Sequence, residues 1–408
     1  MPISPTNRSL SKKVKDVKLK SLLEVTKAIN NNFSTDQLLQ IFQEVLEKEL
    51  NIGKLVLFSN ENDNWKCLLK YGVGQEYNDI NVERDLLSIT EIGTINFSQK
   101  RLNKAFEIVI PVFHKSQSLA YLLIGDLEDT VEVSPAIKHL PFVQTLTSII
   151  VVAIENKKLA RDTIRQAAMR KELELASEMQ SMLFPSKLPR DNNIDTAAFY
   201  LPHQQVGGDY YDFIWLNENE CAFCVADVSG KGVAAALLMS NFQANLRVLF
   251  HHTDSLTELV RELNTKVMAN AKGEKFITLF IAKYNIVTRT LTYVNAAHNP
   301  PLLAVGNSLS TLKIGCTGLG MFDEIEKIKE GIVNISPGTT IVCYTDGLTE
   351  LENDKGDDFG IDSLKELLRK NPTLNMMELN TLIMETVMNY KQSRPYIDDI
   401  ALFCMKVF

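Results

Sequence analysis

The sequence is short of cysteine, histidine and long apolar runs, and each shortage excludes a class of protein. Six cysteines and six histidines among 408 residues are too few for a disulfide framework or a histidine-based metal site. The apolar stretches are too short to cross a bilayer, and the N-terminus lacks the apolar core of a signal peptide. We therefore expect a cytoplasmic protein without a membrane span.

Basic residues are also fewer than acidic ones. The sequence has 43 Lys and Arg against 50 Asp and Glu, which gives a net charge of −7. This balance disfavours nucleic acid as a partner. Hydrophobic residues make up 45% and charged residues 23%, which is typical of a globular protein and excludes disorder as the main state. A length of 408 residues predicts two or three domains.

The one close cysteine pair is Cys221 and Cys224, inside the apolar run 220–228. Such a run is typical of a buried strand. Residues three apart in a strand point to opposite faces, so the two thiols face apart. We predict buried apolar cysteines rather than a redox or zinc site.

The first part of the chain is predicted to be a polar arm followed by an α+β domain. Residues 1–18 are polar and basic, and we interpret them as a solvated arm. Ser34 and Gln37 have the spacing of a capping box, which predicts a second helix after the first. These helices are expected over 20–31 and 35–50, and short strands over 54–59, 65–70, 106–113 and 118–125. Together they form a domain over residues 19–155.

A long helix is predicted over residues 142–184, which contain neither glycine nor proline. Residues 156–184 would form an exposed linker, which Pro185 ends. Apolar side chains recur along it at coiled-coil-like spacings, at Ile164, Ala168, Leu175, Met179 and Met182. We predict that this stripe joins two copies of the chain in a parallel homodimer. The alternative is an amphipathic helix that lies on its own domain.

The rest of the chain, residues 185–408, is predicted to be a second domain of packed sheets flanked by helices. Strand-like runs dominate from 191 to 344. Helices are predicted over 233–252, 256–271, 362–370 and 376–390, and a last strand over 400–408. The overall fold class is therefore α+β.

Two aspartates meet across a predicted hairpin in this domain. The polar residues 217–219 separate two strand-like runs, and a turn centred on Glu218 pairs residues whose numbers sum to 436. Asp209 then lies directly opposite Asp227, with about 5 Å between their Cβ atoms. Like charges at this distance repel each other, and a cation between them would remove the conflict.

Further acidic residues lie at strand ends. Asp346 follows the apolar strand 340–345, while Asp398 and Asp399 start the last strand, where only one of the two is expected to point into a common site. Four aspartates without a histidine or thiolate make a hard oxygen site, which suits Mg²⁺ or Mn²⁺. Two such ions could activate a water and clamp a phosphoryl group. The alternative is that these aspartates are ordinary turn and cap residues.

Glycines surround the first two aspartates. Gly207 and Gly208 allow a tight bend, and Gly230 with Lys231 lies in a glycine loop at a helix start, which favours phosphate. The spacing is not that of a P-loop. Lys231 is either a phosphate contact or a solvated surface lysine. His298 either lines the site or, as we favour, braces a loop.

These motifs together resemble the bacterial metal-dependent Ser/Thr protein phosphatases of the PPM family, in the SpoIIE-like sigma-factor-regulator branch. The segments that carry the resemblance are 207–213 (GGDYYDF), 226–232 (ADVSGKG), 293–300 (YVNAAHNP), 344–349 (YTDGLT) and Asp398–Asp399. The resemblance covers about residues 175–408. It implies an α/β/β/α sandwich of two antiparallel sheets flanked by helices, with two Mn²⁺ or Mg²⁺ ions between the sheets.

The resemblance also implies roles for individual residues. Asp209 would contact both metals, Asp227 and the backbone carbonyl of Val228 would bind one, and Asp346 and Asp398 would bind the other. Water activated by the two metals would attack the phosphorus directly. The family's usual substrate is a phosphoserine or phosphothreonine on a small anti-sigma-antagonist protein.

Three positions depart from the family pattern without removing a metal ligand. Ala297 stands where the family usually has glycine, Ala401 replaces a threonine, and 318–321 (GLGM) replaces the commoner Pro-Leu-Gly. These changes bear on substrate choice rather than on the chemistry.

The first domain resembles a GAF domain, which implies a small ligand or a protein as its binding partner. We hypothesise a signal-regulated phosphoprotein phosphatase, in which the helical linker couples dimer geometry to the metal site. Two alternatives are a non-enzymatic dimeric signalling scaffold, that is a pseudophosphatase, and a phosphohydrolase for small molecules.

Overall fold

The computed structural model describes residues 5–61, 64–94, 106–114, 117–127 and 139–408. It divides into two compact units, Met1–Ala167 and Ala168–Phe408. Each unit is described by itself. Residues 1–4 of the predicted arm lie outside the described residues.

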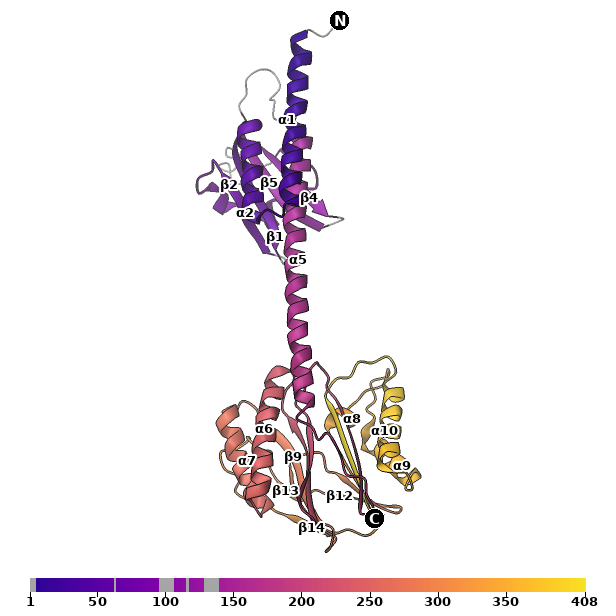
Figure 1. The fold of residues 1–408 in the computed structure, drawn as a ribbon. Helices are drawn as coiled ribbons and strands as arrows, with labels where there is room; N and C mark the ends of the chain where they lie inside the picture. Colours follow the sequence, from indigo (N-terminus) through magenta and orange to yellow (C-terminus); the bar gives the residue numbers. More distant parts are fainter. Residues whose placement is uncertain (1–4, 62–63, 95–105, 115–116, 128–138) are drawn as a thin grey trace. The chain divides into compact units, whose positions relative to one another are not determined.

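The first unit contains one sheet with helices packed on it (Figure 1). Its strands lie in the order β2-β1-β5-β4-β3, and each neighbouring pair is antiparallel. The strands are β1 (Ile52–Glu61), β2 (Asn64–Tyr71), β3 (Gly93–Thr94), β4 (Ile108–His114) and β5 (Gln117–Leu127). The helices are α1 (Pro5–Asn30), α2 (Thr35–Glu44), the π-helix η1 (Val45–Glu49), the 3-10 helix η2 (Glu76–Asp79), α3 (Val82–Asp85) and the first part of α5 (Leu140–Ser181).

Local sequence signals explain how these helices begin. The Ser34 hydroxyl accepts the backbone N–H of Gln37, and the Gln37 side chain accepts the backbone N–H of Ser34, so the predicted capping box is confirmed. Helix α1 starts at Pro5, well before the helix expected over 20–31. Much of the predicted arm is therefore helical.

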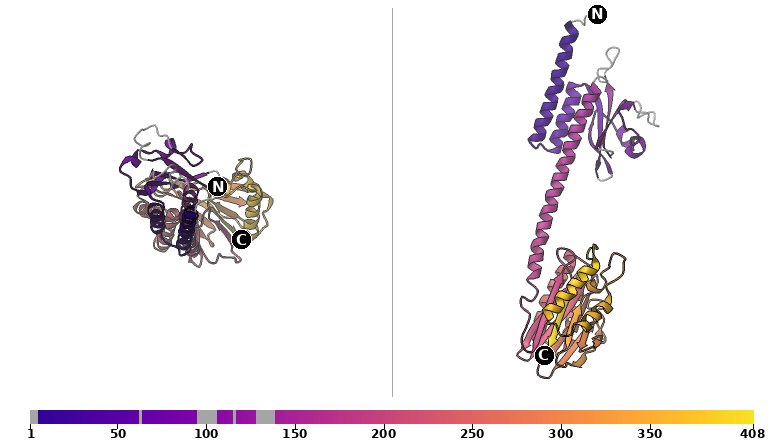
Figure 2. Two further views of the ribbon diagram at one scale, coloured as in Figure 1. Left: turned by 90° about the horizontal axis from the view of Figure 1, so that it is seen from above. Right: turned by 90° about the vertical axis from the view of Figure 1, so that its right-hand side faces the viewer.

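Both faces of the first sheet are covered. One face packs against α1, α2 and α5 through Leu38, Phe42, Leu57, Leu122, Leu146 and Ile150, among others. The right-hand view of Figure 2 shows these three helices on the same side of the sheet. A second cluster lies on the opposite face and includes Val56, Phe58, Val82, Leu86, Tyr121 and Leu123. Alternate residues of β1 and β5 face the two clusters, as the period of a strand requires.

The second unit is a four-layer sandwich in which α6 and α7 cover one sheet and α9 and α10 cover the other (Figure 1). The first sheet has the order β13-β10-β9-β8-β7, with β14 paired to β10, and the second has the order β12-β11-β15-β16-β6. All pairs are antiparallel except β10 with β13. The predicted α/β/β/α arrangement is confirmed.

The bounds of these elements lie close to the predicted ones. The helices are α6 (Val233–His252), α7 (Leu256–Ala271), α8 (Asp346–Thr349), α9 (Gly360–Lys370) and α10 (Met376–Lys391). The strands are β6 (Ile194–Leu201), β7 (Tyr210–Asn217), β8 (Glu220–Val228), β9 (Ile277–Asn285), β10 (Thr290–Ala296), β11 (Leu302–Val305), β12 (Ser308–Thr311), β13 (Gly315–Cys316), β14 (Gly331–Asn334), β15 (Thr340–Tyr344) and β16 (Ile400–Val407).

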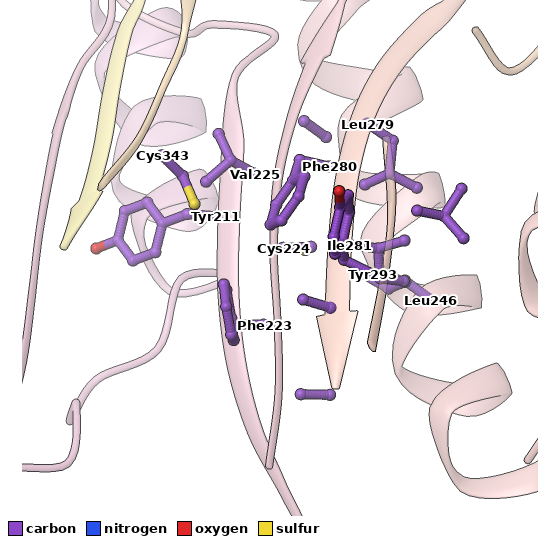
Figure 3. Close-up of a cluster of buried hydrophobic side chains, with 14 of the residues drawn as sticks. Tyr211, Phe223, Cys224, Val225, Leu246, Leu279, Phe280, Ile281, Tyr293 and Cys343 are labelled. Carbon is purple, nitrogen blue, oxygen red and sulfur yellow. The ribbon is translucent and has the colours of Figure 1, made fainter. Parts of the chain in front are cut away.

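The space between the two sheets is filled by aromatic and aliphatic side chains. The Phe223 ring from β8 lies 5.3 Å from the Phe403 ring of β16, which joins the two sheets. Figure 3 shows Tyr211, Phe223 and Cys343 in this region. Cys221 and Cys224 are fully buried, so the prediction of apolar cysteines is confirmed. The core holds the sheets together and leaves their strand ends free for chemistry.

Among the described residues, one helix, α6, is long and apolar enough by length and composition to cross a membrane. Eight of its residues are buried in the second unit, from Ala235 to Phe250. Its apolar character is therefore accounted for by packing against β7 and β8.

Ala297 carries a backbone strain that yields a stability prediction. Its φ is 55°, in the left-handed region that an L-residue with a Cβ adopts at a cost of roughly 1–2 kcal/mol. Ala297→Gly should remove this strain. Glycine also gives the unfolded chain more conformational freedom, which lowers the free energy of unfolding by about 0.4–1 kcal/mol. We expect a net gain of about 0.5–1 kcal/mol in the free energy of unfolding, measured by urea denaturation.

The matched control for this change is Ala304→Gly in strand β11, where the backbone is extended. That substitution should destabilise the protein by about 0.5–1 kcal/mol. If Ala297→Gly destabilised the chain as the control does, the strain argument would be wrong.

Candidate metal centre

The hairpin of β7 and β8 has the predicted register. Tyr210 pairs with Ala226 and Trp215 pairs with Cys221, so the residue numbers sum to 436 until the register shifts beside the turn. The next position outward brings Asp209 opposite Asp227. The two carboxyl groups lie within hydrogen-bonding reach of each other, which places them side by side.

The chain reaches Asp209 through a turn that only glycine fits. A Cβ on Gly208 would lie 2.9 Å from the carbonyl oxygen of Val228, and a Cβ on Gly207 would lie 2.4 Å from the Asp399 carboxylate. Asp399 accepts the backbone N–H of Gly208 at 2.6 Å and that of His203 at 2.7 Å. Asp399 is therefore a positioning residue for the turn, a role that the sequence did not reveal.

Asp346 and Asp398 come from the second sheet and reach the same end of the sandwich. Asp346 is the first residue of α8 and follows the end of β15 after Thr345, and Asp398 lies two residues before β16. Gly347 permits the close approach, because a Cβ there would lie 2.0 Å from the backbone oxygen of Asp399. The electrostatic influence of Asp346 and Asp398 on Asp227 shows that carboxylates of both sheets meet here.

Burial and mutual repulsion perturb the titration of these carboxyl groups. Burial, followed by the charge of Asp227, holds the pKa of Asp209 well above its usual range. Burial and then the charge of Asp346 raise the pKa of Asp227 to about 7. Burial and the charge of Asp398 raise the pKa of Asp346. Ionising the whole cluster is therefore unfavourable without a cation, because the protein compensates its negative charge poorly.

The donor set suits a hard divalent cation. The Oδ2 atom of Asp209 is buried and has no hydrogen-bond partner, so a ligand-binding atom is already desolvated. The other donors are carboxylate oxygens and the Val228 carbonyl, which are the ligands that Mg²⁺ and Mn²⁺ prefer. Within the part of the chain that the structure describes, no three His, Cys, Asp or Glu residues form a ready-made metal-binding group. The ligand set thus stays a prediction.

Lys231 lies against one of the predicted ligands. Its Nζ atom is 2.9 Å from Oδ2 of Asp398 and also donates to the Ile397 carbonyl oxygen. The neighbouring Gly230 has a φ of 84°, and a Cβ there would lie 2.5 Å from the ammonium group of Lys275. A phosphate contact by Gly230 or Lys231 stays a prediction.

His298 is buried and braces the loop after β10. Its Nδ1 atom lies 2.8 Å from the hydroxyl of Thr278, and its backbone N–H donates to Asn295. Burial lowers the pKa of His298 to about 4, so the ring is neutral at physiological pH. Since Thr278 pairs with Asp227 in the ladder, His298 supports the neighbour of a predicted ligand.

A buried ion pair supports the hairpin from behind. Asp212 is fully buried and accepts two hydrogen bonds from Arg247 of α6, at 2.8 and 3.0 Å. The Tyr210 hydroxyl donates to the same carboxylate at 2.6 Å. The pair ties α6 to the strand that begins next to Asp209. Sequence reasoning missed it, because the partners are 35 positions apart.

The end of α5 touches the turn that carries Asp209. The Gln180 amide donates to the Gly207 carbonyl at 2.7 Å and accepts the Gly207 N–H at 3.1 Å. Phe184 follows the helix and stacks on Tyr200, with 4.6 Å between ring centroids. No sequence pattern marks this contact, because the burial of Gln180 is seen only in the structure.

Comparisons with known proteins agree on the C-terminal region. Residues 217–408 match the model of the family described as Stage II sporulation protein E (SpoIIE). The chain is 30% identical over 193 residues to Phosphoserine phosphatase RsbU of Bacillus subtilis. The matched region is 47% of this chain and 57% of RsbU. It is 25% identical to Protein IcfG of Synechocystis sp., over 72% of this chain and 51% of IcfG.

Solved structures give the same picture for the fold. The SiaA-PP2C domain of Pseudomonas aeruginosa superimposes with a TM-score of 0.55 at 20% identity, over 60% of this chain and 99% of that domain. The C-terminal unit therefore has a PP2C-like fold. The chain spans only about half the length of the curated relatives named above.

Proposed function

We propose that this chain is a metal-dependent protein phosphatase that hydrolyses phosphoserine or phosphothreonine. The observation that carries the proposal is the convergence of Asp209, Asp227, Asp346 and Asp398 from four separate segments at one end of the two sheets. Two Mn²⁺ or Mg²⁺ ions held there would polarise the phosphoryl group and lower the pKa of a water. The similarity to a phosphoserine phosphatase supports the same reaction.

The protein's own residues hold the site in place. By the family resemblance, Asp209 would contact both cations, Asp227 and the Val228 carbonyl would bind one of them, and Asp346 and Asp398 would bind the other. Asp399 fixes the turn before Asp209 through two backbone N–H groups. The motifs place no serine or cysteine beside a base, so we propose direct attack by water rather than a covalent intermediate.

The test is Mn²⁺-dependent phosphate release by the full chain. We expect release from a phosphoseryl regulatory protein of the anti-sigma-antagonist type, and none after treatment with a chelator. Release from an aryl phosphate or a nucleotide but from no phosphoprotein would favour a small-molecule phosphohydrolase. No release from any substrate would favour a pseudophosphatase scaffold.

We also propose that the first unit is a GAF-like sensor. Its support is a sheet in the order 2-1-5-4-3 with helices on one face and a second apolar cluster on the other. An open cavity of about 670 Å³ in this unit offers room for a small ligand. It is lined by Glu47, Lys48, Asn51, Ile52, Gly53, Tyr71 and Asp126.

The sensor would act on the metal site through α5. The Gln180 contact with Gly207 links the last turn of this helix to the turn before Asp209. A helix that shifts between two positions could order or release this turn, which is a two-state element.

The proposed dimer depends on the apolar stripe of the linker. The side chains of Ile164 and Leu175 are 70% and 50% exposed, which leaves them available to a second copy. Replacing both with glutamate should convert the protein from a dimer to a monomer, because charge in a coiled-coil seam is not tolerated. Sedimentation velocity measures the change.

Gln166→Glu, on the same exposed helix but off the stripe, is the control and should remain dimeric. A wild-type chain that is monomeric under every active condition would refute the dimer.

A further inference from the structure

The loop between β8 and α6 aims a lysine at the carboxylate cluster. Lys231 lies between Gly230 and Gly232, whose φ angles are 84° and 73°. Positive φ at both positions turns the loop sharply. Its Nζ atom lies 2.9 Å from Oδ2 of Asp398 and donates to the carbonyl oxygen of Ile397. The backbone therefore holds the ammonium group against one predicted metal ligand.

The second lysine near this loop has a different partner. Lys275 donates to the backbone oxygen of Ser229 at 2.7 Å. It thereby holds the loop rather than a carboxylate. Lys231, by contrast, contacts a carboxylate of the cluster directly, since its Nζ atom forms an ion pair with Asp398.

A carboxylate oxygen that holds an ammonium group is not free to bind a second cation. A divalent ion that reached Oδ2 of Asp398 would meet the positive charge of Lys231 at close range. The ion pair is also partly exposed, with both side chains 38% accessible, so the lysine can swing away on its flexible stem.

We propose that Lys231 competes with a divalent cation for Asp398 and thereby sets the metal affinity of the site. The proposal rests on the metal site of the proposed function and adds to it a built-in competitor. Metal binding at Asp398 must displace Lys231, and only the displaced ammonium group is free to contact a phosphate. Lys231 would then pair with Asp398 when no metal is bound and contact a phosphate when metal is bound.

The test is the affinity of chelator-treated full-length protein for Mn²⁺, measured by isothermal titration calorimetry without substrate. Lys231→Gln and Lys231→Met should each bind Mn²⁺ about 3- to 10-fold more tightly than wild type, because the competing charge is gone. Both variants should also melt at a lower temperature without metal, since the carboxylates then repel each other without a counter-ion. Lys231→Arg keeps the charge and should bind within about 2-fold of wild type.

Lys370→Gln is the matched control, because it removes an exposed lysine of α9 that pairs with Glu366, a carboxylate outside the predicted ligands. It should leave the Mn²⁺ affinity unchanged. Equal or weaker binding by both neutral Lys231 variants would overturn the competition while leaving the metal site intact. No Mn²⁺ binding by wild type or any variant would overturn the metal site, and the proposed function with it.

Discussion

Replacing Asp209 by asparagine should abolish metal-dependent phosphate release and at the same time stabilise the metal-free protein. Asp209 is 2% exposed, its pKa is raised by burial and by Asp227, and its Oδ2 atom has no hydrogen-bond partner. An amide of the same shape removes the repulsion, so the metal-free free energy of unfolding should rise by about 1 kcal/mol.

The same substitution should reduce activity by more than about 100-fold. Loss of a residue that only orients a ligand already costs 10- to 100-fold in activity or metal affinity, and Asp209 is predicted to contact both cations. The gain in melting temperature on adding Mn²⁺ to wild type should disappear in the variant, because ligand binding stabilises only a protein that binds it. Phosphate release and thermal unfolding with and without Mn²⁺ measure the two effects.

The control is Asp362→Asn, at a side chain of α9 that is 91% exposed and paired with Lys365. It removes one carboxylate from the same unit and should change neither activity nor the effect of Mn²⁺. An Asp209→Asn protein that kept activity within tenfold of wild type would contradict the proposed site.

Arg247→Leu should destabilise the chain by about 2–3 kcal/mol. It leaves the Asp212 carboxylate buried without its two charged hydrogen bonds, while the Tyr210 hydroxyl and the Phe213 N–H remain. Breaking a buried ion pair costs about 3–5 kcal/mol. We expect a loss of only about 2–3 kcal/mol here, because the Arg247 side chain is 43% exposed and solvent screens part of the interaction. Urea denaturation of the full chain measures the loss.

A second substitution separates charge from packing. Asp212→Asn in the Arg247→Leu background removes the unpaired charge and should recover at least half of the loss. Arg261→Leu, at an exposed arginine of α7, is the control for losing a surface arginine and should change stability by less than about 0.5 kcal/mol. If Arg247→Leu were as stable as this control, the ion pair would have no structural role.

Much of the second unit could be predicted because its signals are local. The hairpin register follows from the turn at Glu218 and the period of two, which brings Asp209 to Asp227. Helices α6 and α7 have the predicted bounds because Gly232, the Ser255 cap and apolar spacing mark them within a few residues. The start of the first unit was harder to predict. A polar segment there forms the first part of helix α1, although no local apolar pattern indicates it.

The sequence by itself determined most elements of the second unit, since each depends on neighbours in the chain, and the resemblance of its motifs indicated the sandwich. The role of the four aspartates as ligands stays a prediction. Only the tertiary structure decided what surrounds those aspartates. Asp399 holds the glycine turn, Arg247 neutralises Asp212, and Lys231 lies on Asp398, and each contact joins residues far apart in sequence. Such partners are chosen by packing of the sheets and helices and by the cost of burying a charge unpaired, which no local pattern records.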